Sequence, residues 1–222
     1  MLNHVVRTDT TQTFLSSYRI MLLVFDIETT GNPSHRRWNT YNHFSDIEFY
    51  RTSRVVQLGC VLYNESGDLL DMKEWIIKPK NWFHMSPTAY KTHCISEDYA
   101  EANGFEFDNI APAFQELLSK ATTLVAHDAK LIKNVLAAEC FVQGFPQMSE
   151  ELLAKPIKCT MTMGANMTCI LPYRYDSYRA PKLMELYENL FQAPYKHHAI
   201  YDALACGKCY FKMINRSRSD IM

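Results

Sequence analysis

The sequence predicts an α/β domain in which a mixed five-stranded sheet carries helices on both faces. Three strand-like segments come first, and helical and strand-like segments then alternate towards the end of the chain. This order is typical of a mixed sheet with helices packed against it. No apolar run approaches the roughly 18 residues that a membrane span needs, so we expect no association with a membrane.

The strand segments are marked by apolar and β-branched residues. Residues 21–25 form the first, and residues 55–63 and 69–77 form a hairpin around a Ser-Gly-Asp turn. Two shorter segments, 122–126 and 156–160, complete the expected sheet.

The helices are predicted from capping residues and from apolar residues at helical spacing. Ser86 and Pro87 suit the N-cap and the first position of a helix. Residues 107–119 carry Ile110 and Phe114 on one helical face. Further helices are expected over residues 129–141, 182–190 and 199–214.

Composition narrows the class of protein. The 222 residues are 47% hydrophobic and 21% charged, which is typical of a globular protein and excludes wholesale disorder. The 23 basic and 24 acidic residues nearly cancel, which excludes a protein that coats nucleic acid through bulk charge. Seven cysteines without regular spacing indicate reduced thiols in an intracellular protein, cytoplasmic or nuclear and not secreted. We expect residues 1–20 to be a loose tail, 21–214 a single domain and 215–222 a frayed tail.

Asp26 and Glu28 directly follow the first apolar segment and are the first candidates for a metal site. Because side chains alternate along a strand, both carboxylates project from the same face. Oxygen ligands gathered on one face suit Mg²⁺ or Mn²⁺. An acidic strand end that faces water is the alternative. The apolar run before the pair and Gly31 after it favour the metal site.

A histidine and an aspartate near the other end of the sequence suit the same chemistry. Asp202 follows Ala199, which opens a helical stretch, and His197 stands just before that stretch. Asp202 is then a third carboxylate for the metal. His197 suits a general base for water because the histidine pKa lies near neutrality. Residues of these types near a helix start are also common caps.

Together the two segments resemble motifs of the DEDDh exonucleases, such as RNase T and the proofreading subunit of the bacterial replicative polymerase. Asp-Ile-Glu-Thr-Thr-Gly resembles their first motif, and His-His-Ala-Ile-Tyr-Asp-Ala resembles their third. The resemblance covers residues 21–214 and implies an RNase H-like fold. It also implies two divalent ions and hydrolysis of phosphodiester bonds at the 3′ end of single-stranded DNA or RNA, which releases nucleoside 5′-monophosphates.

The resemblance also implies a role for each matching residue. Asp26, Glu28 and Asp202 match the carboxylates that hold the ions, and His197 matches the general base. His93 matches a histidine close to the terminal nucleotide, and the cysteine that follows it stands where the family has glycine. Further expected substrate contacts are Thr29, Thr30, His127, Arg36 and Arg37.

The second motif departs from the family. The family pattern His-Asn-Ala-x-Phe-Asp falls on His-Asp-Ala-Lys-Leu-Ile, so Ile132 stands at the position of an aspartate that supports the second ion. In one explanation Asp128, about one helical turn earlier, replaces that carboxylate. An aspartate at a helix start is also a common N-cap, so a site with a single ion stays an alternative. In the other explanation the protein binds nucleic acid without turnover, for example as a polymerase-associated module.

Residues 33–54 are longer than the corresponding link in the family. This segment interleaves cations such as Arg36 and Arg37 with aromatic residues such as Trp38 and Tyr41, which suits the phosphates and bases of a single strand. A loop that packs its aromatic residues on the domain is an equal alternative. The partners expected are the 3′ ends of single-stranded nucleic acid, and a polymerase or another replication protein.

Overall fold

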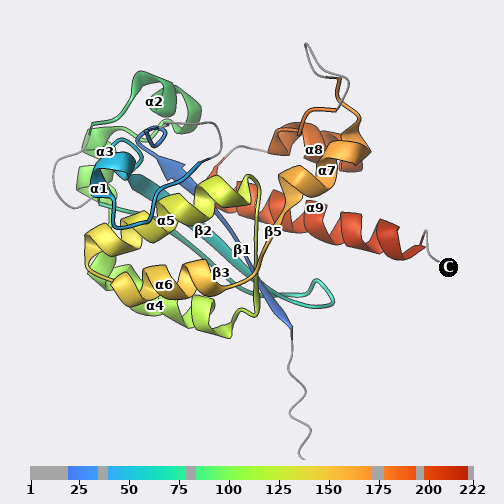
Figure 1. Ribbon diagram of the computed structural model, residues 1–222, viewed down its shortest axis with the longest axis horizontal. Coiled ribbons are helices and arrows are strands. Elements are labelled where there is room, and N and C mark those ends of the chain that lie inside the picture. Colours follow the sequence, from blue (N-terminus) through green and yellow to red (C-terminus); the bar gives the residue numbers. More distant parts are fainter. Residues whose placement is uncertain (1–19, 35–39, 79–83, 172–177, 194–197, 220–222) are drawn as a thin grey trace, which may run out of the picture.

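A single mixed sheet organises the chain. The computed structural model describes residues 20–34, 40–78, 84–171, 178–193 and 198–219. Its five strands lie in the order β3-β2-β1-β4-β5 (Figure 1), which confirms the predicted sheet. The strands are β1 (Met21–Thr29), β2 (Val55–Asn64), β3 (Leu69–Ile76), β4 (Thr123–Ala126) and β5 (Ile157–Cys159).

The pairing of these strands is antiparallel on one side of β1 and parallel on the other. Strands β1, β2 and β3 form an antiparallel meander, because each follows the previous one through a link that reverses direction. Strand β4 then pairs with β1 in parallel, and β5 pairs with β4 in parallel. Helices provide the connections that parallel pairing requires.

Helices cover both faces of the sheet, as predicted (Figure 1). They are α1 (Ile47–Tyr50), α2 (Pro87–His93), α3 (Glu97–Asn103), α4 (Phe107–Lys120), α5 (Ala129–Gln143), α6 (Pro146–Ala154), α7 (Thr160–Thr168), α8 (Leu183–Phe191) and α9 (Ala199–Ser219). Helices α4, α5 and α6 share one core cluster with the sheet, and α8 and α9 share the other. The longest helix of the described part, α9, runs to Ser219 and so passes residue 214, where the sequence pattern ends.

The alternation of side chains along β1 decides which face receives each residue. Leu23 and Phe25 pack on the face of α4 and α5, whereas Leu22 and Val24 pack on the face of α8 and α9. Asp26 has the same parity as Val24, and β1 continues past it to Thr29. The acidic end of β1 therefore opens towards α9. No helix in the described residues is both long and apolar enough to span a membrane.

Candidate functional site

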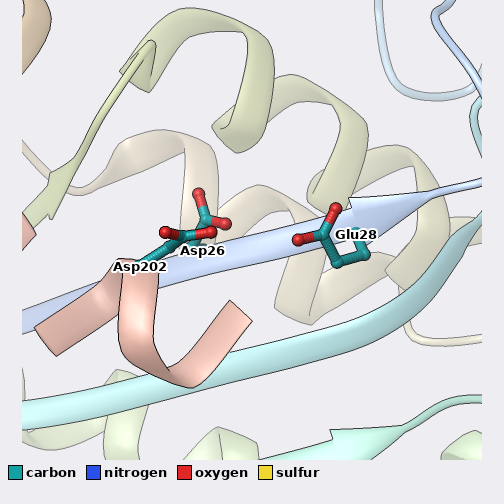
Figure 2. Close-up of side chains that lie close together, drawn as sticks. All are labelled: Asp26, Glu28 and Asp202. Carbon is teal, nitrogen blue, oxygen red and sulfur yellow. The ribbon is translucent and has the colours of Figure 1, made fainter. Parts of the chain in front are cut away.

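Three carboxylates from two elements meet where β1 ends and α9 begins. Asp26 and Glu28 project from β1, and Asp202 enters from the first turn of α9 (Figure 2). One oxygen of each lies within 4.8 Å of the others. Glu28 and Asp202 are buried, at 7% and 2% exposure, and Asp26 keeps partial contact with solvent. The structure thus brings together the three carboxylates predicted from the sequence.

The first turn of α9 packs on β2 at Gly59, which places Asp202. A Cβ atom on Gly59 would lie 2.6 Å from the backbone carbonyl of Ala199 and 2.6 Å from the backbone nitrogen of Ile200. Only glycine permits this approach of helix backbone to strand. The amide of Asp202 donates to the carbonyl of His198 at 2.8 Å. Asp202 therefore belongs to the turn of α9 that packs on β2, and this turn positions its carboxylate.

Two side chains of the sheet hold the same turn from its N-terminal side. The Nδ1 atom of His198 lies 2.7 Å from Oε1 of Glu74 on β3, which suits donation by an Nδ1–H. Nε2 of Gln57 on β2 lies 3.0 Å from Nε2 of His198, so the histidine accepts there. The amide of Ile200 donates to the same Glu74 oxygen at 3.3 Å. These contacts fix the start of α9 against two strands.

The carboxylate cluster suits a divalent cation. Burial raises the pKa of Asp26 well above its ordinary value, and the charges of Asp202 and Glu28 raise it further. Like charges held this close in a partly dry site are stabilised by a proton or by a cation between them. Hard carboxylate oxygens are the ligands of Mg²⁺ and Mn²⁺. The donor set therefore fits the metal expected from the sequence.

His127, at the end of β4, anchors the segment before α8. Its Nε2 lies 3.0 Å from the carbonyl of Pro181, and its Nδ1 lies 3.0 Å from the hydroxyl of Thr160. A carbonyl only accepts, so Nε2 carries the proton and Nδ1 accepts from the hydroxyl. Burial lowers the pKa of His127, which keeps the ring neutral. Both ring nitrogens contact protein groups, and the ring lines a cavity beside Asp26 and Asp202.

The second motif places Asp128 outside the group of close metal-ligating atoms and Ile132 in the core. Asp128 is the N-cap residue of α5 in a left-handed conformation with φ of 55°, and its side chain makes no capping hydrogen bond. The pKa of Asp128 is raised, because the effect of burial outweighs the opposite effect of the Leu131 amide. The group of close metal-ligating atoms in the described residues contains Asp26, Glu28 and Asp202 but not Asp128. Ile132 is 7% exposed and belongs to the core cluster of α4 and α5.

His93 and Thr29 border a second cavity, of about 370 Å³, next to Glu28. The amide of Ile95 donates to Nδ1 of His93 at 3.0 Å, so Nε2 carries the proton and donates to the carbonyl of Thr29 at 3.1 Å. These bonds link the end of α2 to the end of β1. The residue after His93 is Cys94, which adopts the left-handed conformation, with φ of 60°, that glycine favours.

The other expected substrate contacts divide into two groups. Thr30 is 1% exposed, and its hydroxyl donates to the carbonyl of Thr52 at 3.0 Å and accepts from the amide of Arg54 at 3.0 Å. It therefore joins the end of β1 to the start of β2. Arg36, Arg37 and the expected general base, His197, lie outside the described residues.

The described part of the 33–54 segment packs on the domain. Its buried aromatic residues belong to the core cluster of α4 and α5; they are Phe44, Phe49 and Tyr50. Arg54 forms a buried pair with Glu139 of α5, in which Nε and Nη2 donate to the two carboxylate oxygens at 2.9 and 2.8 Å. For the described residues the structure therefore favours packing over base stacking.

Sequence reasoning did not single out two residues at the site, Gln57 and Glu74. Gln57 and Glu74 were strand residues without a special pattern, and they contact α9 across more than a hundred residues of chain. The sequence predicts a contact to the phosphate backbone for a basic and aromatic stretch over residues 173–182, of which residues 173–177 lie outside the described part. Lys182, at the end of this stretch, lines a cavity of about 390 Å³ together with Asp26 and Asp202. The order of residues around Lys182 carries no local sign of that cavity.

Comparison with protein families identifies the class of protein. A family model described as exonuclease, RNase_T, matches residues 23–210. The chain belongs to the RNase T family of exonucleases. The match includes both the strand that carries Asp26 and Glu28 and the helix that carries Asp202. No curated protein matches the chain.

Solved structures confirm the fold of this exonuclease domain. E. coli exonuclease I in complex with a 5cy-dT13 oligonucleotide superposes with a TM-score of 0.66 and 15% identity, covering 91% of this chain and 41% of that chain. Product-bound exonuclease I superposes with a TM-score of 0.66 and 15% identity, covering 90% of this chain and 45% of that chain. A moderately thermophilic exonuclease I from Methylocaldum szegediense superposes with a TM-score of 0.64 and 15% identity, covering 89% of this chain and 40% of that chain. The RNase H-like fold is therefore confirmed, and this chain spans less than half the length of those proteins.

Proposed function

We propose that this exonuclease-family protein is a metal-dependent 3′→5′ exonuclease that acts on single-stranded nucleic acid. The observation that carries the proposal is the meeting of Asp26, Glu28 and Asp202 within 4.8 Å, inside a domain of the exonuclease family. Cavities of about 370 and 390 Å³ border this cluster, and both are lined by Thr92. They offer space for a strand end directly beside the carboxylates.

In this proposal Asp26, Glu28 and Asp202 hold Mg²⁺ or Mn²⁺. A bound divalent cation supplies a Lewis acid for phosphate oxygens and lowers the pKa of water. The three ligand atoms form one group in the described residues, which supports one ion directly; a second ion needs a further ligand.

His197 is the proposed general base, on the strength of its place in the third motif, five residues before Asp202. It would take a proton from the water that attacks the last phosphodiester phosphorus. The bond from phosphorus to the 3′ oxygen of the preceding nucleotide then breaks. The products are a nucleoside 5′-monophosphate and a strand shortened by one nucleotide with a new 3′ hydroxyl. General base catalysis of this kind contributes about 10²- to 10⁴-fold.

DNA is the first substrate to test. Exonuclease I structures with the same fold contain dT13 and dA16 oligonucleotides, which supports single-stranded DNA as a starting choice. RNA stays the other candidate, because no described residue identifies a contact to a 2′ hydroxyl. We place the protein in an intracellular compartment, since its seven cysteines are free thiols.

Release of mononucleotides tests the proposal. Purified protein is incubated with single-stranded DNA and with RNA in Mg²⁺, Mn²⁺ or EDTA, and the products are separated by chromatography. We expect nucleoside 5′-monophosphates with the wild type in either metal and none in EDTA. Asp202→Asn should lose the release, and Asp108→Asn, at an exposed position on α4, should keep it. Release by Asp202→Asn at the wild-type rate would overturn the proposal.

One observation favours a second function, the binding of strand ends without hydrolysis. Ile132 is packed in the core, and the motif resemblance matches its position with a metal-supporting aspartate of the family. If the wild type binds single strands without shortening them, and Ile132→Asp gains activity, the binding function is the correct one. A polymerase or another replication protein is then the partner to seek, and this partner stays a prediction.

A further inference from the structure

A cation, Lys182, lines the cavity that holds Asp26 and Asp202. The cavity has a volume of about 390 Å³, and its other lining residues are Thr92, His127, Leu183 and Met184. We propose that Lys182 binds a backbone phosphate of the substrate strand beside the carboxylate cluster. This proposal rests on the proposed function, because a phosphodiester substrate is what brings an anion to this cavity.

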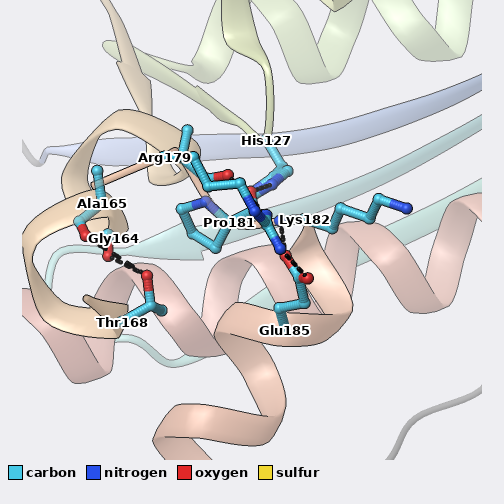
Figure 3. A network of polar contacts seen from close by, with 9 residues as sticks. His127, Gly164, Ala165, Thr168, Arg179, Pro181, Lys182 and Glu185 are labelled. Atoms are coloured by element: carbon cyan, nitrogen blue, oxygen red, sulfur yellow. Dashed lines mark hydrogen bonds and ion pairs between the residues drawn. The ribbon is translucent and has the colours of Figure 1, made fainter. Parts of the chain in front are cut away.

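The backbone at Lys182 is held in place from two sides. His127 donates to the carbonyl of Pro181 at 3.0 Å and so ties the segment to the end of β4. The amide of Lys182 donates to Oε2 of Glu185 at 2.7 Å, and Arg179 binds both oxygens of the same carboxylate. Figure 3 shows these contacts, with the Lys182 side chain extending away from the pair of Arg179 and Glu185. A fixed backbone with an exposed ammonium group suits contact with an incoming strand.

The negative charges of Asp26 and Asp202 at the cavity favour a cation that contacts the substrate. A phosphodiester that lies next to Asp26 and Asp202 meets two carboxylates, and a like charge nearby is unfavourable without compensation. Of the described residues that line the cavity, Lys182 is the side chain with a permanent positive charge. Lysine binds phosphate as a point charge and tolerates several approach directions.

The residues after Lys182 extend the same surface with apolar side chains. Leu183 is nearly buried at 9% exposure, and Met184 is 49% exposed, and both line the cavity. A nucleotide whose phosphate meets Lys182 therefore finds an apolar surface for its sugar or base. Sites for single strands combine cations that contact the backbone with side chains against which bases lie.

Salt-dependent binding tests the proposal without relying on turnover. Binding of a fluorescein-labelled single-stranded DNA is followed by anisotropy in EDTA, from 50 to 300 mM KCl. The slope of log K against log salt is negative, and for each lost phosphate contact we expect its magnitude to fall by about 0.7. Lys182→Ala and Lys182→Gln should both show this fall and a roughly three- to tenfold weaker binding. Lys182→Arg should restore the slope, and Lys212→Ala, an exposed lysine further along α9, should keep it.

A neutral linkage provides the matching test during cleavage. With a methylphosphonate in place of the phosphate that Lys182 contacts, wild type and Lys182→Ala should have equal KM, whereas with normal DNA the variant should have the higher KM. Slopes and KM values of Lys182→Ala and Lys182→Gln equal to those of an active wild type would overturn this inference alone. A wild type that neither binds nor shortens single strands would overturn the proposed function and this inference together.

Discussion

At the scale of single residues, the site is defined by carboxylates that repel one another. Asp26 has partial access to solvent, yet desolvation and the neighbouring Asp202 and Glu28 raise its pKa well above the ordinary value of 3.8. The fold tolerates this crowding because the core on both faces of β1 holds the strand rigidly. Because the carboxylates repel one another, binding of a cation between them stabilises the folded protein.

The raised pKa of Asp26 predicts how stability changes with pH in EDTA. Between the unfolded and folded pKa values of Asp26 the native protein binds more protons than the unfolded chain, so the contribution of Asp26 to stability increases as pH falls through this range. Asp26→Asn should remove this part of the pH dependence and raise the Tm at neutral pH. About 1 kcal/mol shifts Tm by roughly 2–4 °C at this chain length. Thermal unfolding between pH 4 and 8 measures this, with Asp108→Asn as the control; a higher Tm of the wild type at neutral pH would contradict it.

Because Asp202 belongs to the group of close metal-ligating atoms and Asp128 does not, we expect the two aspartates to differ in importance. Asp202→Asn should reduce the rate by more than roughly 100-fold, since even outer-shell partners of a metal are worth about 10- to 100-fold. Asp128→Asn should change it less than about threefold, because its carboxylate is not in the metal-ligating group. Initial rates of both variants in Mg²⁺ provide the comparison. Equal losses in the two variants would show that Asp128 acts as a ligand.

At the scale of elements, two backbone features place the functional side chains. Gly59 lets the first turn of α9 lie directly on β2. Gly59→Ala should displace that turn and with it Asp202, with a loss of about 1–3 kcal/mol in stability and a lower kcat. Gly144→Ala, where the added Cβ meets nothing within 4 Å, should lose about 1 kcal/mol through its positive φ of 99° and keep kcat. Denaturant unfolding and kinetics of both variants test this; an unchanged kcat in Gly59→Ala is the contrary result.

The end of α2 carries strain that glycine would relieve. Cys94 occupies the left-handed region, which costs a residue with a side chain about 1–2 kcal/mol. Cys94→Gly should remove this strain, but the greater freedom of its unfolded chain costs roughly 0.4–1 kcal/mol of stability. We therefore expect the free energy of unfolding to rise by about 0.5–1 kcal/mol. Ala102→Gly in the right-handed helix α3 should instead lose about 1 kcal/mol. If urea unfolding shows both variants destabilised, the strain argument fails.

The sequence predicted all five strands and the helices with clear apolar spacing or capping residues, and it missed four other helices in the described part of the chain. Apolar and β-branched runs marked the five strands, and apolar residues at helical spacing marked helices α4, α5, α8 and α9, each of which buries side chains in a core cluster. Helices α1, α3, α6 and α7 were missed, since they are one to three turns long and bury few side chains. The apolar run of β1 ends at residue 25, yet the strand continues to Thr29 because its backbone keeps pairing with β2.

The site was predictable only where motifs mark it. Asp26, Glu28 and Asp202 were predicted as one cluster and they meet. The sequence could not show that Glu74 and Gln57 hold the start of α9, because their contacts join residues 126 to 142 positions apart. It also left open whether residues 33–54 stack on bases or pack, and burial of Phe49 answers this for the described residues.

At the scale of the whole molecule, one buried ion pair joins the start of β2 to α5. Glu139 is 2% exposed and accepts from Arg54, from the amide of Val55 at 3.1 Å and from Gln143 at 2.7 Å. Loss of one partner leaves a buried charge uncompensated, so Glu139→Leu should reduce stability by about 3–5 kcal/mol. The double variant Arg54→Met with Glu139→Leu should lose less than Glu139→Leu alone. Chemical denaturation decides this, and an equal or larger loss in the double variant would refute it.

The central claim is that the carboxylate cluster serves a 3′→5′ exonuclease, and the shortening of an end-labelled strand tests it most directly. A single-stranded DNA labelled at its 5′ end is incubated with the wild type or Asp202→Asn in Mg²⁺ or EDTA, and products are resolved by length. We predict a ladder of products that shorten one nucleotide at a time from the 3′ end. The ladder should form only in the reaction that contains the wild type and Mg²⁺. Immediate release of the labelled 5′ nucleotide, or a ladder that persists in EDTA or with Asp202→Asn, would contradict the claim.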